Sequence, residues 1–185
     1  MERDVVERAK RGDREAFAVL VDASIARLYN LAQLMLADTD LADDAVQEAL
    51  IAAWRDLRSL RNPERFSAWL MQVLVRCVYR AAKQERRQGA LRRVSPADGD
   101  RFSDPTRDLE DRDAIDRGFR RLTAEYRAVL IVHHYLGLSD DEAADVLGIP
   151  PGTVKSRLHR ATLAMRAELE ADSRAGQTER AGASR

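Results

Sequence analysis

The sequence is poor in the residues on which several common protein classes depend. It has one cysteine, Cys77, so no disulfide can form within the chain. Aromatic residues make up 5% of the 185 residues and there are nine glycines, whereas β-sheet proteins need aromatic or β-branched strands and turn glycines. No apolar run reaches the roughly 20 residues that span a bilayer. These shortages argue against a disulfide-stabilised, an all-β or a membrane-inserted protein.

Residue patterns typical of catalytic and metal sites are also missing. His133 and His134 are adjacent on a predicted helix and so diverge, and His159 stands alone. No phosphate-cradling glycine loop or nucleophile elbow occurs, and Cys77 lies in an apolar stripe typical of an inert core thiol. We therefore expect no enzymatic activity, no cofactor and no metal. The N-terminus is charged rather than apolar, which excludes a secretory signal there and predicts a cytoplasmic protein.

Net charge is absent overall, but positive charge is concentrated locally. The 31 lysines and arginines balance 31 acids, giving a pI of about 6.9. The stretch from Arg76 to Arg93, however, contains seven basic residues and a single acid, Glu85. A second basic cluster lies near the C-terminus and consists of Lys155, Arg157 and Arg160. Local clusters of this kind are typical of a protein that meets phosphates at defined surfaces.

The apolar periodicity predicts an all-α protein of two small helical domains. The expected helices lie near residues 3–12, 13–36, 41–57, 66–87, 109–121, 123–136, 140–147 and 151–170. Residues 88–108 contain prolines, a glycine and several aspartates without apolar period, which predicts a flexible linker between domains 1–87 and 109–170. The small polar residues 171–185 predict a disordered tail.

Residues 138–160 have the pattern of a helix-turn-helix. Ser139 and Glu142 form a capping box that starts a short helix, and Gly148 suits the left-handed turn that ends it. Pro150 or Pro151 fits the first turn of the next helix. That second helix has an apolar stripe and, on another face, the side chains of a major-groove reader: Thr153, Ser156, Arg157 and Arg160, with Lys155 beside them.

The helix predicted at 40–57 has a polar face opposite its apolar stripe. This face carries acids, an amide, an arginine and one isoleucine: Asp44, Gln47, Glu48, Ile51 and Arg55. An isoleucine set among acids favours a docking surface for a basic partner over plain solvated surface. Composition alone leaves both interpretations open.

The helix predicted at 66–87 begins apolar and ends basic. Arg76, Arg80, Lys83 and Arg87 recur along one face, and Tyr79 is expected to be available to stack on a base. The preceding loop, RSLRNPER at 58–65, supplies donors for phosphates or for the edges of an unpaired base, namely Arg58, Arg61, Asn62 and Arg65. A solubilising helix end and an ordinary polar loop are the alternatives.

These segments, in this order, resemble the sigma factors of bacterial RNA polymerase. DLADDAVQEALIAAWRDL (40–57) and FSAWLMQVLVRCVYRAAKQERR (66–87) resemble region two, and LSDDEAADVLGIPPGTVKSRLHRATLAMRAEL (138–169) resembles region four. The likeness is to the compact extracytoplasmic-function class, in which only a linker separates the two regions. It covers about residues 5–170 and implies a non-enzymatic protein that binds core RNA polymerase, selects promoter DNA and is held by an anti-sigma factor.

The resemblance also implies a role for each polar face. Asp44, Gln47 and Glu48 would meet the polymerase clamp, with Ile51 and Arg55 on the same face. The loop 58–66 would hold a base flipped from the minus-ten element, and the helix around Arg76, Tyr79, Arg80, Lys83 and Arg87 would contact DNA there. Thr153, Lys155, Ser156, Arg157 and Arg160 would read the minus-thirty-five element.

The sequence departs from the family at two of these positions. Family members commonly have asparagine at the position of Arg76, and often an acid or amide at that of Arg80, so minus-ten readout is expected to differ in this chain. A stand-alone helix-turn-helix regulator is the competing interpretation. It is distinguished by the acidic face of 40–57, which such a regulator does not need.

Overall fold

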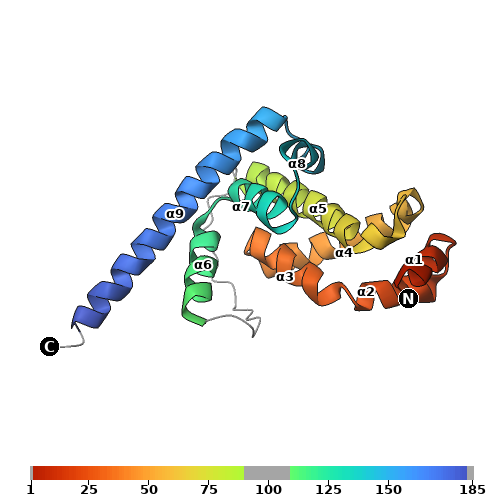
Figure 1. The fold of residues 1–185 in the computed structure, drawn as a ribbon, viewed down its shortest axis with the longest axis horizontal. Helices are drawn as coiled ribbons and strands as arrows, with labels where there is room; N and C mark the ends of the chain where they lie inside the picture. The colour runs from red at the N-terminus through yellow and green to blue at the C-terminus, as the bar shows by residue number, and fades with distance from the viewer. Residues whose placement is uncertain (1, 90–108, 183–185) are drawn as a thin grey trace. The chain divides into compact units, whose positions relative to one another are not determined.

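The structure, a computed structural model, describes residues 2–89 and 109–182 of the chain. Within these ranges the chain folds into helices and turns and has no strand, which confirms the all-α prediction. The helices form two compact units, one containing α1 to α5 and the other α6 to α9 (Figure 1). Most of the predicted linker, residues 90–108, lies outside the described residues.

The first unit consists of five α-helices and two short 3-10 helices. Its α-helices are α1 (Glu2–Lys10), α2 (Arg14–Asp22), α3 (Ile25–Leu36), α4 (Thr39–Asp56) and α5 (Phe66–Gly89), and η1 (Leu57–Ser59) and η2 (Pro63–Arg65) connect the last two. Aspartates start two of these helices. The backbone N–H of Ala16 donates to Asp13 at 3.0 Å, and that of Leu41 donates to Asp38 at 2.9 Å.

The core of this unit is built around α4, which packs against both α3 and α5. The buried side of α4 is made almost entirely of small residues, Ala42, Ala45, Val46, Ala49 and Ala53. We call these five residues the alanine seam. The helices that pack on α4 contribute larger side chains to the core, including the fully buried Leu28 of α3 and Phe66 of α5. Burying each such large side chain contributes about 1.5–3 kcal/mol.

The helix predicted at 13–36 is in fact two helices. The axes of α2 and α3 differ by 56°, and the break is closed by the N–H of Ser24 donating to the carbonyl of Val21 at 2.8 Å. Each half has its own partner, because α2 packs mainly on α1 whereas α3 packs on α4 and α5. A single straight helix could not pack against both sets of partners. The apolar period of the sequence does not reveal the break between α2 and α3.

The second unit contains α6 (Leu109–Arg121), α7 (Ala124–Leu130), the π-helix η3 (Ile131–Tyr135), α8 (Asp140–Leu147) and α9 (Pro151–Gly182). Helix α9 packs against each of α6, α7 and α8. Its buried residues Val154 and Ala161 lie two turns apart, and Gly118 of α6 lets that helix approach Met165 closely. The second unit is therefore organised around one long helix.

Helix α9 extends beyond its predicted end. We expected a helix to about 170 followed by a disordered tail, but the helix continues to Gly182. Two arginines of α6 explain the first added turn, since Arg117 donates to Asp172 at 2.8 Å and Arg121 lies 3.6 Å from the same carboxylate. The added residues also contain no proline. This corrects the prediction of disorder for residues 171–182.

Among the described residues, no single helix combines the length and hydropathy of a membrane span. Helices α2 and α3 meet that test only when taken together across their 56° bend. In α3 the apolar residues Leu28, Leu31, Ala32 and Met35 are buried within the first unit.

The cap of α8 gives a direct test of local stability. We expect Ser139→Ala to lower the free energy of unfolding of the second unit by about 1 kcal/mol, because it removes both hydroxyl contacts of the capping box. Thermal or urea unfolding measures the change. Ser173→Ala, which removes an exposed mid-helix hydroxyl of α9, is the matched control and should not destabilise the protein. Equal losses for both variants would contradict the capping role.

Candidate nucleic-acid and partner interface

The polar face of α4 is exposed to solvent. Asp44, Gln47, Glu48, Ile51 and Arg55 all lie at the surface, and the Ile51 side chain is 62% exposed. The alanine seam on the opposite side of the helix fixes this orientation, since it must face α3 and α5. An exposed isoleucine flanked by two acids and an amide provides both apolar area and negative charge to a partner.

The basic face of α5 is exposed in the same unit. Arg76, Arg80, Lys83 and Arg87 are solvent-accessible at successive turns, while Leu70, Leu74 and Val78 of the same helix are buried. The helix is thus anchored by its apolar residues and extends its last turns as a row of positive charge. Such a row matches the charge of a nucleic-acid backbone.

Tyr79 does not belong to this exposed row. Its side chain is only 8% exposed, because it follows the fully buried Val75 by one helical turn and so lies on the apolar side of α5. The prediction that Tyr79 stacks on a base is therefore wrong for this structure, and Tyr79 is a core residue.

One ion pair joins the polar face of α4 to the basic face of α5. Arg80 donates to Glu48 Oε1 at 2.8 Å, and the two side chains are 64% and 52% exposed. From the sequence, Glu48 was predicted to meet polymerase and Arg80 to meet DNA. The two residues are 32 positions apart, so the sequence did not predict their contact. The two faces are therefore adjacent parts of one surface. An exposed pair of this kind contributes about 0.2–1 kcal/mol.

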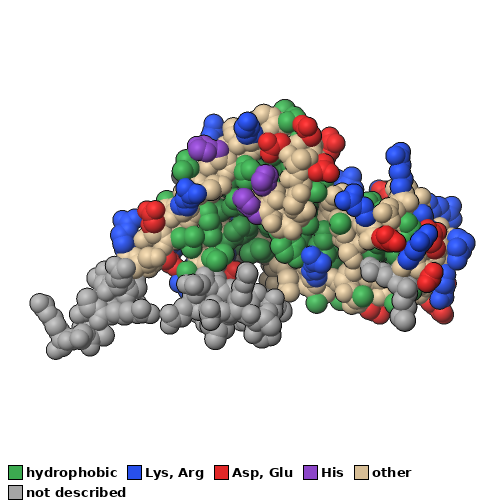
Figure 2. Space-filling view, in the orientation of Figure 1, with side chains coloured by type: hydrophobic (Ala, Val, Ile, Leu, Met, Phe, Trp, Pro, Cys, Tyr) green, Lys and Arg blue, Asp and Glu red, His purple; other side chains and the backbone are tan. Residues whose placement is uncertain are grey.

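The loop between α4 and α5 presents most of its polar residues outward. Arg58, Arg61, Asn62 and Arg65 are exposed, while Leu57 and Leu60 are buried and anchor the loop. The Asn62 side-chain oxygen accepts from the N–H of Glu64 at 3.0 Å and caps η2, which Pro63 begins. Lys and Arg side chains gather at this end of the first unit, where α1 and the loop lie (Figure 2).

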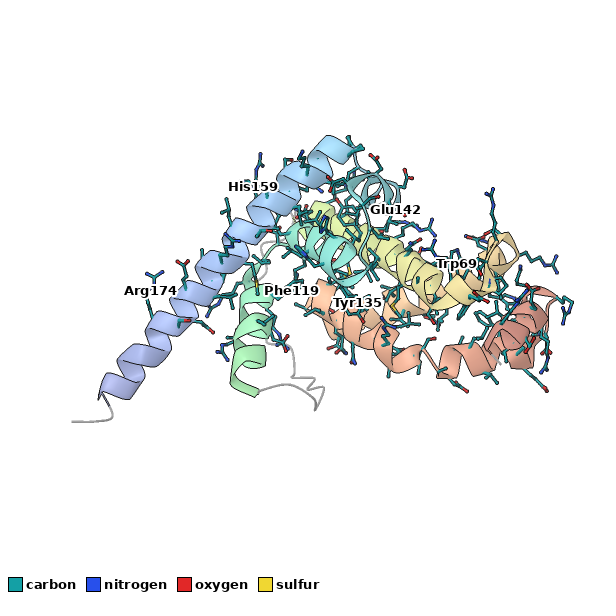
Figure 3. The ribbon with its side chains drawn as sticks, viewed as in Figure 1. Trp69, Phe119, Tyr135, Glu142, His159 and Arg174 are labelled. Carbon is teal, nitrogen blue, oxygen red and sulfur yellow. The ribbon has the colours of Figure 1, made fainter. Side chains whose placement is uncertain are left out.

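The turn between α8 and α9 has the predicted helix-turn-helix geometry. The Ser139 N–H donates to Glu142 Oε2 at 2.9 Å and the Ser139 hydroxyl accepts from the Glu142 N–H at 3.4 Å, which completes the capping box. Gly148 ends α8 with φ of 63°, in the left-handed region that favours glycine. Helix α9 then begins at Pro151. Figure 3 shows Glu142 on α8 and His159 further along α9.

The candidate reading residues occupy the first three turns of α9. Lys155, Ser156 and Arg160 are exposed, and Thr153 and Arg157 are partly exposed. Val154 is completely buried, so its side of the helix faces the core of the unit. All five candidates thus come together at the amino-terminal end of α9, the part of a recognition helix that contacts base edges.

Two buried titratable groups have structural rather than chemical roles. Burial raises the pKa of the Cys77 thiol, and the negative charge of Glu48 adds to this effect, so the thiol stays protonated at neutral pH. Burial lowers the pKa of Arg127, with a further contribution from Arg120, to about 10, which leaves the side chain charged at neutral pH. Sequence analysis did not single out Arg127. Within the described residues no cluster of His, Cys, Asp and Glu could hold a metal ion.

Two protein families match the chain, one in each unit. The family described as "Sigma-70 region 2" matches residues 20–88, and "Sigma-70, region 4" matches residues 112–165. The first match contains the α4 face, the loop and the α5 face, and the second contains the helix-turn-helix.

Several characterised relatives are similar over most of the chain. The extracytoplasmic-function RNA polymerase sigma factor SigW of Bacillus subtilis is 31% identical over 176 residues, covering 89% of this chain and 94% of that protein. SigM of Mycobacterium tuberculosis is 35% identical over 152 residues, covering 81% and 75%. The sigma-E factor of Escherichia coli is 29% identical over 174 residues, covering 85% and 88%.

Solved structures give the same result. The sigma factor RpoE of Bartonella quintana, solved with the anti-sigma factor NepR, is 25% identical with a TM-score of 0.63, covering 84% of this chain and 98% of that one. CnrH, solved with the cytosolic domain of CnrY, is 26% identical with a TM-score of 0.54, covering 92% and 98%. This chain belongs to the extracytoplasmic-function class of the sigma-70 family and is a non-enzymatic transcription initiation factor.

Proposed function

We propose that this sigma factor uses the α4 face to bind core RNA polymerase and its two basic surfaces to place the polymerase on promoters. The observation that carries the proposal is the pairing of an acidic, partly apolar face on α4 with a basic row on the adjoining face of α5, joined by the Glu48–Arg80 contact. One face suits a basic protein surface and the other suits DNA. Together they allow the chain to connect polymerase to promoter.

The proposed roles assign each part of the chain to a sigma-factor region. Residues 1–87 would form region two, residues 88–108 the linker and residues 109–170 region four. The family matches at 20–88 and 112–165 support these assignments. A linker of about 20 residues, if extended, spans at most about 70 Å, which is enough for the two regions to reach separate promoter elements.

Docking on the polymerase would involve the outward face of α4. Asp44 and Glu48 supply negative charge, Gln47 supplies hydrogen bonds and Ile51 supplies the apolar centre of the contact. Apolar contacts surrounded by polar groups are typical of protein interfaces. Arg55 lies at the edge of this face, where its guanidinium donates to Asp56 at 3.0 Å.

Opening and reading of the minus-ten element would involve the loop and α5. Arg58, Arg61, Asn62 and Arg65 are exposed and would supply donors to an unpaired base. The Asn62 side chain is oriented by accepting from the Glu64 N–H. The basic row of α5, namely Arg76, Arg80, Lys83 and Arg87, would hold the adjacent backbone. Arginine at the two positions that depart from the family, Arg76 and Arg80, favours phosphate affinity over base discrimination.

Reading of the minus-thirty-five element would involve the first turns of α9. Arg157 and Arg160 can pair with guanine edges, and Thr153 and Ser156 can reach bases or phosphates. Lys155 would contact phosphate beside them. The Ser156 hydroxyl already donates to the carbonyl of Thr153 at 3.1 Å, which orients it within the helix.

The charge balance supports a protein that acts on DNA only with its partner. Because 31 basic residues are offset by 31 acids, the free chain has little general affinity for polyanions. Docking of the acidic α4 face on polymerase would cover negative charge and leave the basic surfaces facing DNA. We therefore infer that promoter affinity arises in the holoenzyme.

Regulation and location are inferred from the family. The Bartonella quintana relative was solved with an anti-sigma factor, and we infer that an anti-sigma factor likewise restrains this chain. We place the protein in the cytoplasm, where RNA polymerase acts. A stand-alone regulator is not favoured, since it would leave the α4 face without a role.

The docking role predicts a specific loss of polymerase affinity. We expect Gln47→Ala combined with Glu48→Ala to weaken binding to core RNA polymerase by about tenfold or more while the fold is retained, because interface affinity depends on a few central residues. Fluorescence anisotropy with labelled sigma factor and purified core measures this. Glu15→Ala with Asp22→Ala, two exposed acids of α2, is the control and should bind normally. Unchanged binding by the α4 variant would count against the docking face.

The Glu48–Arg80 pair predicts a coupled effect on DNA. We expect Glu48→Gln to raise the affinity of the free chain for a single-stranded minus-ten oligonucleotide by about two- to fivefold, because Arg80 loses a competing carboxylate. In an Arg80→Ala background the same change should have little effect. Anisotropy titrations at fixed salt measure all four proteins. An equal gain in both backgrounds would mean that the pair does not restrain Arg80.

The recognition helix predicts a promoter-dependent loss. We expect Arg157→Ala to weaken promoter binding by the holoenzyme by about 1–3 kcal/mol if the side chain pairs with a guanine, and more strongly on promoters that contain that base. Gel-shift titrations on a set of minus-thirty-five variants provide the comparison. An identical loss on every sequence would instead identify a phosphate contact.

A further inference from the structure

Helix α1 has a contact that the proposed function does not use. It precedes residues 20–88, the part matched by the region-two family, yet it packs against both η1 and η2 of the α4–α5 loop. These segments are more than 45 positions apart in sequence. Val6 and Ala9 of α1 are buried, as are Leu57 and Leu60 of the loop. The loop is therefore supported from outside by α1 as well as by its own ends.

The carboxy-terminal end of α1 is connected to the start of α2 by an ion pair. Arg8 makes two contacts with the Asp13 carboxylate, through Nε at 2.9 Å and Nη2 at 2.7 Å, and the chain reverses between them at Gly12 with φ of 97°. Backbone hydrogen bonding from Ala16, followed by the Arg8 contact, lowers the pKa of Asp13, so the carboxylate is ionised at neutral pH. The pair thus joins α1 to the N-cap of α2, and the two helices also pack against each other.

The amino-terminal end of α1 reaches the polar residues of the loop. Arg3 Nη1 lies 4.0 Å from Glu64 Oε1. Glu64 in turn donates its backbone N–H to the Asn62 side chain at 3.0 Å. The Arg3 and Glu64 side chains are 69% and 68% exposed. The amino-terminal end of α1 thus lies near Glu64, whose backbone N–H bonds to Asn62, the residue that we place beside the unpaired base.

We propose that α1 positions the loop 58–65 for base selection at the minus-ten element, with Arg3 and Val6 as positioning residues. This inference rests on the proposed role of the loop. The buried Val6 fixes the position of α1 against its neighbours, and Arg3 restrains the Glu64 side chain. Because a readout site must hold its groups within a fraction of an ångström, loosening α1 reduces discrimination between bases more than it reduces affinity for polymerase.

The test compares selectivity rather than total activity. Holoenzyme is assembled from core polymerase and full-length sigma factor, and open-complex formation is followed on a promoter and on versions with each minus-ten base replaced. We expect Val6→Ala and Arg3→Glu to lower discrimination at the flipped position by about five- to tenfold, with core affinity within about twofold of the parent. Arg3→Lys keeps the charge and should retain discrimination.

Two controls separate this inference from its alternatives. Val129→Ala truncates a fully buried valine of α7 and should reduce opening equally on all promoters, as any general loss of stability would. Asn62→Ala and Arg61→Ala test the loop itself. If these loop variants lose discrimination but the α1 variants do not, the role of α1 is overturned and the proposed function stands. If the loop variants retain discrimination, the loop does not select bases and the inference falls with that assignment.

Discussion

The placement of every proposed interface in the first unit depends on the alanine seam of α4. Alanines at Ala42, Ala45, Ala49 and Ala53, with Val46, allow α4 to approach its neighbours closely, and all five are essentially inaccessible to solvent. Larger side chains there would separate the helices, and polar side chains there would be buried away from the water that hydrogen-bonds them. Because this side of α4 must face inward, Gln47, Glu48 and Ile51 must face outward. The same packing fixes the rotation of α5 and brings Arg80 within 2.8 Å of Glu48.

The two units expose their basic side chains in different ways. Each is proposed to present charged side chains to DNA, and each must also bury enough apolar surface to fold. The first unit does so with a helix, α5, whose apolar residues Leu70, Leu74 and Val78 are buried while Arg76 and Arg80 remain exposed. The second unit uses a long helix that packs against three shorter ones, with the candidate reading residues in its first three turns. In both units the basic surface lies on a helix whose apolar residues are buried in the core of that unit.

Local features were predictable from sequence, whereas contacts between distant segments were not. The capping box at Ser139 and the left-handed Gly148 depend on residues a few positions apart, and the structure confirms both. The break at Ser24, the burial of Tyr79 and the extension of α9 past residue 170 depend on which helix packs against which, and periodicity does not carry that information. The Glu48–Arg80 pair and the seat of α1 on the loop were missed for the same reason. Residue types thus predicted the chemistry of each face, and tertiary packing determined which residues share it.

The most direct test of the central claim is transcription with purified components. The full-length protein is combined with core RNA polymerase on a fragmented library of the source genome, and transcript starts are sequenced. Our account predicts discrete starts that share two motifs at a fixed spacing, one for each DNA-reading surface, and that are absent with core polymerase alone. Starts indistinguishable from those of core alone, with a bound anti-sigma factor excluded by mass spectrometry, would contradict it.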